Sequence, residues 1–195
     1  MSNGPTPPGL WWSPPATDGY VYDVEKAKEL LAKSGVPAGT ELVLAAPTDN
    51  VLRQLNQLVK EQVEAIGLKV RLDPVSQSEW YARVVDKKIN FTPMRWTQRA
   101  DPDGLLYILF HSKGYANTTG YSNPEVDRLL DEARSIDDMA KRKELYDQVH
   151  KLLLEDLPYV PVGFAAEFVA MNKDVHGFRW IPDLIPRFRA MWKAQ

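Results

Sequence analysis

The stretch FTPMRWTQRADPDG, residues 91–104, has the pattern of a short apolar strand, a polar loop and the start of a helix. In open α/β sheets, ligands bind in the loops outside the carboxyl ends of the strands. This loop carries Trp96, which offers a flat stacking face, and Arg99, whose guanidinium can donate two parallel hydrogen bonds to an anion. We therefore expect a ligand site here. A surface ion pair between Arg99 and Asp101 is the alternative interpretation.

The acidic residues of the same stretch have a structural explanation. Asp101 stands at the N-cap position, Pro102 takes the first helical position, and Asp103 places negative charge in the first turn. The competing interpretation makes Asp101 and Asp103 the paired carboxylates of a hydrolase. Catalysis is disfavoured because the three histidines lack metal-ligand spacing, and the sequence contains no nucleophile elbow or phosphate-binding glycine loop. We expect no metal and no cofactor.

Composition narrows the class of protein. A chain of 195 residues is long enough for a sizeable core, and 24 basic against 26 acidic residues give a net charge of −2, which disfavours a nucleic-acid partner. No apolar run is long enough to span a membrane, and residues 1–19 lack the charged start and apolar centre of a signal peptide. We therefore expect no direct membrane insertion. The absence of cysteine excludes disulfides and thiol nucleophiles.

The first half of the chain predicts a βαβ unit. Apolar spacing and caps indicate a helix over 24–33, ended by Gly35, and then a strand over 40–46. A helix over 51–66 and a strand over 68–72 complete the unit, whose strands should be parallel. Further on we expect a helix over 79–86 and a third strand over 90–95, which places the opening stretch at a strand's carboxyl end.

The second half is predicted to be mainly helical. We expect helices over 101–110, 125–134 and 139–154, followed by strands over 159–162 and 168–171. The connection over 112–122 is rich in Gly, Asn, Thr and Tyr. In one interpretation Tyr115, Asn117 and Thr118 supply neutral hydrogen bonds to a ligand. In the other, the same residues form a plain surface loop.

The two ends of the chain differ from its middle. Residues 1–20 hold five prolines and should be extended, with Trp11 and Trp12 anchored on the body of the protein. We assign 21–175 to one α/β ligand-binding lobe and 176–195 to a tail. Because the tail carries Trp180, Phe188 and Trp192, its apolar surface should be covered, either by this lobe or by a second copy in a homodimer.

Four groups of motifs occur in a fixed order over nearly the whole chain. They are Tyr22-Asp23 with Ala27-Lys28-Glu29-Leu30-Leu31 and Gly35; Trp96, Arg99 and Asp101-Pro102-Asp103; Tyr121-Ser122-Asn123-Pro124-Glu125-Val126-Asp127 with Leu129-Leu130; and Leu153-Leu154-Glu155-Asp156-Leu157-Pro158-Tyr159-Val160-Pro161. Together they closely resemble the oligopeptide and dipeptide class (family 5) of extracytoplasmic solute-binding proteins of ABC importers.

The resemblance implies a fold class, a function and partners. The fold would be a periplasmic-binding-protein-like α/β lobe, with a mixed, mostly parallel sheet flanked by helices. The function would be non-catalytic uptake of a peptide or related solute outside the cytoplasm, with an ABC transporter permease as partner. Full-length members have two lobes joined by a hinge, and this chain resembles only the C-terminal lobe. Residues 1–20 would then be the former hinge region, the N-terminal lobe would be missing, and binding by this chain alone should be weak.

One position departs from the pattern of peptide-binding members. Those members often have an aspartate three places after the tryptophan, which pairs with the amino group of the ligand; here that place holds Arg99. By charge, Arg99 favours a carboxylate or another anionic or carbonyl-rich group. With Trp96, Arg99 and Asp101, the ligand-binding candidates include Tyr115, Asn117 and Thr118. A scaffold domain without a ligand is the third possibility, against which a deep groove lined by Trp96 and Arg99 would argue.

Overall fold

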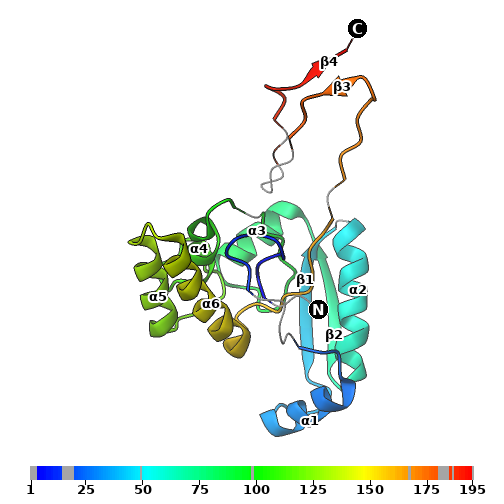
Figure 1. Ribbon diagram of the computed structural model, residues 1–195. Coiled ribbons are helices and arrows are strands. Elements are labelled where there is room, and N and C mark those ends of the chain that lie inside the picture. Colours follow the sequence, from blue (N-terminus) through cyan, green and yellow to red (C-terminus); the bar gives the residue numbers. More distant parts are fainter. Residues whose placement is uncertain are drawn as a thin grey trace. The chain divides into compact units, whose positions relative to one another are not determined.

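The computed structural model describes residues 4–14, 20–48, 50–97, 99–166, 168–179, 185 and 187–194. The chain forms two compact units (Figure 1). One consists of residues 21–95, and the other combines residues 1–20 with residues 96–195. This division cuts the expected 21–175 lobe after residue 95, so the assignment of 21–175 to one ligand-binding lobe stays a prediction.

The unit of residues 21–95 is built on a parallel strand pair. β1 (Glu41–Pro47) pairs with β2 (Lys69–Val75) over their full length. α2 (Asn50–Ala65) makes the crossover that a parallel pair requires and lies along these strands in Figure 1. The predicted βαβ unit is confirmed. Its core consists of Leu44, Ala46 and Val70, with Val59, Val63 and Phe91 packed against them.

Two further helices of this unit begin at side-chain caps, and the helix predicted over 79–86 starts two residues earlier than expected. Asp23 Oδ1 accepts a hydrogen bond from the Lys26 amide at 2.8 Å and starts α1 (Val24–Ser34), which ends at Gly35 with a positive φ of 76°. The Ser76 hydroxyl accepts from the Glu79 amide at 3.2 Å and starts α3 (Gln77–Val85). A second small core forms where α3 meets β2: Val75, Trp80 and Val84.

The predicted third strand over 90–95 is wrong. The segment runs beside β1 but bonds to it only locally: the Ala45 amide donates to Phe91 O at 3.1 Å, and the Thr92 hydroxyl donates to Ala45 O at 2.6 Å. Pro93 has no N–H and cannot continue a ladder. The Trp80 indole instead fixes the segment by donating to the Thr92 hydroxyl at 2.7 Å. The stretch 91–104 therefore begins in extended chain, and its first part is still held against β1.

The other unit is helical. The expected helix over 101–110 is divided into a 3-10 turn η1 (Pro102–Gly104) and α4 (Leu106–Phe110). The predictions for α5 (Pro124–Arg134) and α6 (Met139–Asp156) are confirmed, and Figure 1 shows these two helices side by side. The largest core of the described chain lies among these elements and consists of Trp12, Leu105, Leu106, Leu109, Phe110, Ala116, Val126, Leu129, Leu130, Ala133, Leu145, Tyr146, Val149 and Leu153.

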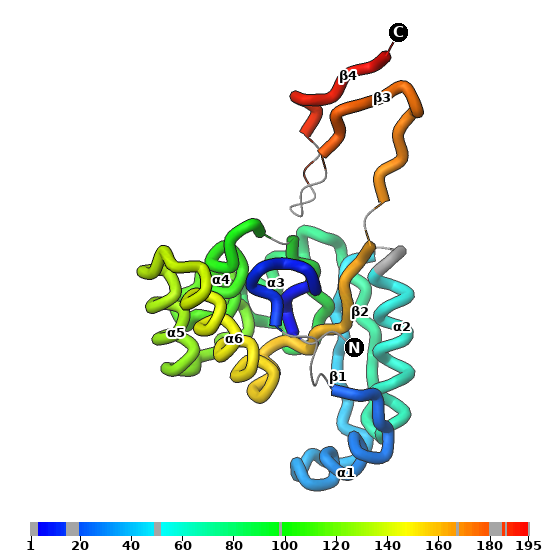
Figure 2. Tube along the Cα trace, viewed as in Figure 1, coloured from blue at the N-terminus to red at the C-terminus, as the bar shows by residue number. Residues whose placement is uncertain are grey.

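The N-terminal segment packs onto this helical core, as Figure 2 shows for the dark-blue trace beside α6. The Trp12 side chain is completely buried, and Trp11 packs edge-on against Tyr146 with ring centroids 6.2 Å apart. The Thr6 hydroxyl lies 2.7 Å from His150 Nε2 in the interior. The expected anchoring of Trp11 and Trp12 is confirmed.

The end of the chain forms less regular structure than predicted. In the described part, residues 159–162 and 168–171 form no strand, and Pro158 and Pro161 deprive the first of these segments of backbone donors. A short antiparallel pair, β3 (Val175–His176) and β4 (Trp192–Lys193), occurs instead. Phe188 and Trp192 are mostly exposed, and Trp180 lies outside the described residues, so the covering of the tail stays a prediction. Among the described helices, none has the length and apolarity needed to cross a membrane.

Candidate functional site

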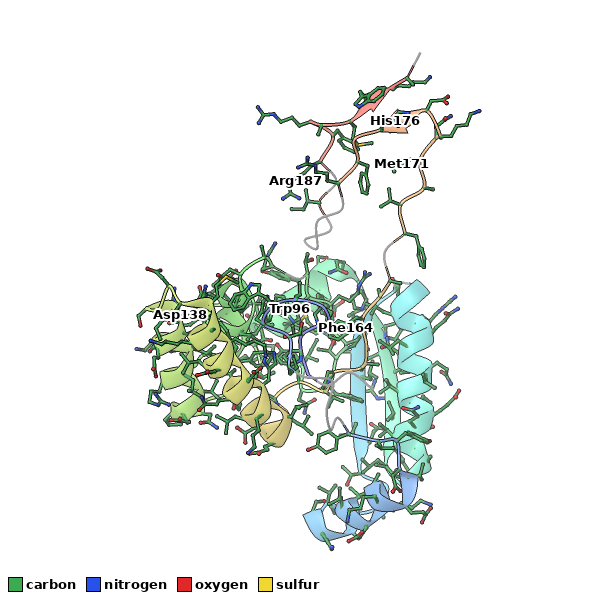
Figure 3. The ribbon with its side chains drawn as sticks, viewed as in Figure 1. Trp96, Asp138, Phe164, Met171, His176 and Arg187 are labelled. Carbon is green, nitrogen blue, oxygen red and sulfur yellow. The ribbon has the colours of Figure 1, made fainter. Side chains whose placement is uncertain are left out.

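The loop after Trp96 exposes the two side chains that were expected to bind a ligand. Trp96 is 37% exposed and Arg99 is exposed, so neither is sealed in the core. Figure 3 labels Trp96. The aliphatic stem of Arg99 lies against Gly104, where an added Cβ would meet Arg99 Cγ at 3.1 Å and Arg99 Cβ at 3.3 Å. Gly104 therefore makes room for Arg99 to lie across the start of the helix.

Asp101 is the N-cap of η1, as predicted. Its Oδ1 accepts from the Asp103 amide at 2.9 Å, and its two oxygens accept from Arg142 Nη1 and Nη2 at 3.0 and 2.9 Å. Partial burial raises the pKa of Asp101, but the hydrogen bonds from Arg142 and the Asp103 amide outweigh it, and the pKa is lowered. The alternative Arg99–Asp101 pair is not formed, because the carboxylate of Asp101 is taken by Arg142.

Asp103 has its own basic partner. Arg134 Nε on α5 lies 2.8 Å from Asp103 Oδ1. The Arg134 guanidinium also stacks over the Tyr107 ring, 3.9 Å from its centroid, and that ring stacks on His111 with centroids 4.2 Å apart. Two arginines from two helices thus neutralise the two aspartates beside Arg99.

Arg99 itself is left without an internal partner. Within the part of the chain that the structure describes, its side chain makes no ion pair and no hydrogen bond. The positive charge of Arg99 is therefore uncompensated, on the same loop as a half-exposed indole. An anionic group with a flat apolar part is the chemistry that these two side chains suit.

Tyr159 connects two of the predicted site residues. Its hydroxyl lies 3.2 Å from Thr118 Oγ1 and also receives a hydrogen bond from the Trp96 indole. Burial raises the pKa of Tyr159, and the bonds from Thr118 and Trp96 partly offset this. The Tyr159 ring packs edge-on against Phe110, with centroids 5.5 Å apart. The structure thus brings Trp96 and Thr118 together through one phenol that is anchored in the core.

The other residues of the 112–122 loop behave differently. Asn117 is buried: its Nδ2 donates to His111 O at 3.1 Å and to Tyr121 O at 2.7 Å, while its Oδ1 accepts from the Tyr121 amide and the Thr119 hydroxyl. These bonds use its hydrogen-bonding capacity within the loop. Tyr115 is 85% exposed and is not brought to Trp96 by any described contact. Ligand contact by Tyr115, Asn117 or Thr118 stays a prediction.

A cavity of about 270 Å³ lies next to the paired charges. It is lined by Asp101, Asp103, Arg134, Ile136, Asp137 and Arg142. Neither Trp96 nor Arg99 is in this lining, so this cavity is not the deep groove that would argue against a scaffold. The arginines also count against hydrolase chemistry at Asp101, because a general acid needs a raised pKa and this pKa is lowered.

Sequence reasoning missed two residues of this arrangement. Arg142 lies in the helix predicted over 139–154 and was not among the candidate site residues, yet its side chain is only 16% exposed and closes on Asp101. Tyr159 was expected in a strand. For Arg142 no local pattern carries the signal, since its partner lies 41 positions away. For Tyr159 the flanking Pro158 and Pro161 already indicated an irregular segment.

Comparisons with known proteins agree on one family. The family model for bacterial extracellular solute-binding proteins, family 5 Middle, matches residues 2–117. The chain is 31% identical over 184 residues to the dipeptide-binding protein of Pseudomonas aeruginosa, a match covering 90% of this chain and 34% of the relative. It is 28% identical over 186 residues to heme-binding protein A of Haemophilus influenzae, with 91% and 34% covered. The chain thus spans about a third of the length of these curated relatives.

Solved structures show the same fold. The periplasmic binding protein DppA of Helicobacter pylori, in complex with the peptide STSA, matches with a TM-score of 0.87 at 24% identity, covering 98% of this chain and 38% of that one. HbpA2 of Haemophilus parasuis matches with a TM-score of 0.87 at 25% identity, covering 98% and 39%. The chain therefore shares the fold of these solute-binding structures.

Proposed function

Because the chain belongs to the bacterial extracellular solute-binding proteins of family 5, we propose that it supplies one ligand-binding face of an ABC importer's solute-binding component. The solute is held at the loop that follows residue 95. Trp96 stacks on its flat or apolar part, and Arg99 donates charge-assisted hydrogen bonds to its anionic group. The role is binding and delivery, without chemistry on the solute.

One observation carries this proposal. Asp101 and Asp103 are paired with Arg142 and Arg134, whereas the charge of Arg99 on the same loop has no internal partner among the described residues. An exposed arginine with an uncompensated charge beside an indole is suited to an anion that arrives from solution. Tyr159 supports this proposal because its hydroxyl bonds to the Trp96 indole and to Thr118, which restricts the motion of the Trp96 side chain.

The ligand class follows from Arg99. The relatives are named for dipeptides, heme and glutathione, and each of these molecules carries at least one carboxylate. An arginine fork matches a carboxylate in two-point geometry, whereas it repels a free amino terminus. The proposed solute therefore presents a carboxylate, or a similar anion, to Arg99.

The proposal also covers how the solute is enclosed and where the protein works. In this scheme the solute lies between this face and a complementary N-terminal lobe, and closure is driven by contacts that exist only when both faces engage. The closed form docks on a permease, and the protein works outside the cytoplasm, in line with the family description. A single face provides part of these contacts, so this chain alone should bind weakly. Pairing of two copies through the 176–195 tail is a further part of the proposal.

The test uses N-acetyl-L-phenylalanine, which combines an aromatic ring with a carboxylate and has no free amino group. It is titrated into the ¹⁵N-labelled chain, and the Trp96 indole N–H is followed by NMR, with assignment by Trp96→Phe. We expect a millimolar Kd that Arg99→Gln weakens by about tenfold, the change expected when a charge-assisted hydrogen bond is lost. Arg95→Gln, at an exposed arginine nearby, is the matched control and should retain binding.

Two results would count against the proposal. A Trp96 resonance that stays unmoved at saturating probe would favour the scaffold alternative. A micromolar or tighter Kd for this chain would contradict the need for a second lobe.

A further inference from the structure

Arg142 is unusually constrained for an arginine on a helix surface. Its side chain is 16% exposed, and it donates to both oxygens of Asp101 and, through Nη2, to the Tyr146 hydroxyl at 3.1 Å. Its guanidinium also lies 5.4 Å from the centroid of the Trp11 ring. These contacts hold it in one place, where it ties α6 and the N-terminal segment to the loop that carries Arg99.

Because Asp101 lies close to Arg99 in the chain, the pairing of Asp101 with Arg142 affects which partners Arg99 can have. The two residues are two positions apart, and the stem of Arg99 lies against Gly104, in the same turn that Asp101 caps. A free Asp101 carboxylate, two positions along the chain, would be an internal anion with which Arg99 could pair. If Arg99 paired with that carboxylate, the two guanidinium N–H groups that an incoming carboxylate needs would be occupied.

Asp103 is arranged in the same way. Arg134 lies 2.8 Å from its Oδ1 and is fixed from the other side by the Tyr107 ring. The two acids next to Arg99 are thus each neutralised by an arginine from a different helix, α5 or α6. The pattern leaves one basic group of this loop unpaired and exposed to solvent, while both of its acids are paired with arginines.

We propose that Arg142 is a positioning residue which, by occupying Asp101, prevents that carboxylate from pairing with Arg99 and so keeps the Arg99 guanidinium available to an anionic solute. This inference rests on the proposed role of Arg99 in binding. Arg142, which lies outside the binding loop, thereby controls whether the charge of Arg99 is available at the site.

The variant series is designed around rescue. Arg142→Gln frees Asp101 and should lower the affinity for N-acetyl-L-phenylalanine by roughly fivefold, the size of an exposed ion-pair competition. Adding Asp101→Asn removes the freed carboxylate and should restore affinity to within about twofold of the wild type. If Arg142 only stabilised the fold, the double variant would bind no better than the single one, and that result would overturn the inference.

A second readout does not depend on the ligand. The Arg99 Nε–H signal is observed by ¹⁵N NMR in the free protein and assigned with Arg99→Gln. We expect it to exchange rapidly in the wild type, to shift downfield and exchange more slowly in Arg142→Gln, and to return in the double variant. An unchanged Arg99 signal in Arg142→Gln would contradict the inference.

The two readouts separate failure of the inference from failure of the proposed function. If the wild type does not bind the probe, the proposed function fails, while the Arg99 signal still decides whether Asp101 captures Arg99. If Arg142→Gln does not fold, Arg142→Lys takes its place: a lowered affinity that Asp101→Asn restores supports the inference, and an unchanged affinity overturns it. Arg142→Lys, which keeps the charge but not the two-point fork, should lie between wild type and Arg142→Gln.

Discussion

The Thr6 hydroxyl and His150 Nε2 lie 2.7 Å apart in the interior, although the two residues are 144 positions apart in the chain. His150 Nδ1 lies 2.7 Å from Tyr146 O, which can only accept, so Nδ1 carries the proton and Nε2 accepts from Thr6. The imidazole is therefore held neutral between α6 and the N-terminal segment. Burial lowers the pKa of His150 to about 4, despite the opposing bond to Tyr146.

This geometry predicts a pH-dependent stability. An unfolded histidine binds its proton below pH 6.5, whereas folded His150 does so only near pH 4. The unfolded state thus binds more protons in this window, and the free energy of unfolding should fall by about 3 kcal/mol as the pH drops from 6.5 to 4. Urea unfolding at several pH values measures this. His150→Gln should flatten the dependence, leaving the part due to carboxylates such as Asp101 and Asp156, whose pKa values are lowered in the fold. An equal slope in both proteins would refute this account.

Trp12 should be the most costly residue of the N-terminal segment to remove. It is completely buried in the helical core and stacks on His150, with ring centroids 6.3 Å apart. Trp12→Ala should lower the free energy of unfolding by about 3 to 5 kcal/mol, the usual cost of deleting a large core aromatic. Tyr115→Ala, at an 85% exposed aromatic, is the control and should change it by less than about 0.5 kcal/mol. Similar losses in the two variants would show that the segment is not docked as described.

Asn117 is expected to act mainly on the loop that contains it. Its amide makes four hydrogen bonds within residues 111–121 while buried, and Asn117→Ala removes all four. His111 O keeps its bond from the Gly114 amide, and the Tyr121 amide keeps its bond to Thr119 Oγ1, so the main loss is at Tyr121 O. The free energy of unfolding should fall by about 1 to 3 kcal/mol, measured by urea unfolding. Thr119→Ala removes one of these bonds at the loop surface and should cost about 1 kcal/mol or less. Equal and small losses would indicate that water replaces the Asn117 bonds.

Gly177 should be required for the β3–β4 pair. Its φ is 78°, and a Cβ at this position would lie 2.0 Å from Ala190 O. Gly177→Ala should therefore separate the two strands and abolish the NOE between the His176 and Trp192 rings, which stack with centroids 4.5 Å apart. Figure 3 labels His176 in this pair. Gly163→Ala, where a Cβ has free space and φ is not in the left-handed range, should leave the NOE intact. Persistence of the NOE in Gly177→Ala would refute the described pairing.

The local part of the fold could be predicted from the sequence because its signals are local. Asp23, Asn123 and Asp138 stand just before periodic apolar runs, and each caps the helix that follows. Two β-rich runs that flank a helical pattern predict the parallel pair of β1 and β2. The burial of Trp12 could be predicted because its side chain is large and apolar, although its segment forms no helix or strand.

The rest depends on distant partners. The segment over 90–95 has strand composition, but Pro93 and competition from the Trp80 and Thr92 side chains prevent a ladder. At the site, the sequence offered Arg99 as the partner of Asp101, whereas the structure pairs Asp101 with Arg142. The choice of Arg142 depends on where α6 runs in the folded chain, which no spacing in the sequence expresses. The role of Tyr159 depends in the same way on where the chain runs after α6.

The most direct measurement of the central claim compares a carboxylate with its neutral amide. N-acetyl-L-phenylalanine and N-acetyl-L-phenylalaninamide are each titrated into the wild-type chain and into Arg99→Gln, with the Trp96 indole N–H as the reporter. We predict that the wild type prefers the carboxylate by about tenfold and that Arg99→Gln binds the two probes equally. Equal affinities in the wild type, or a preference that survives in Arg99→Gln, would contradict it.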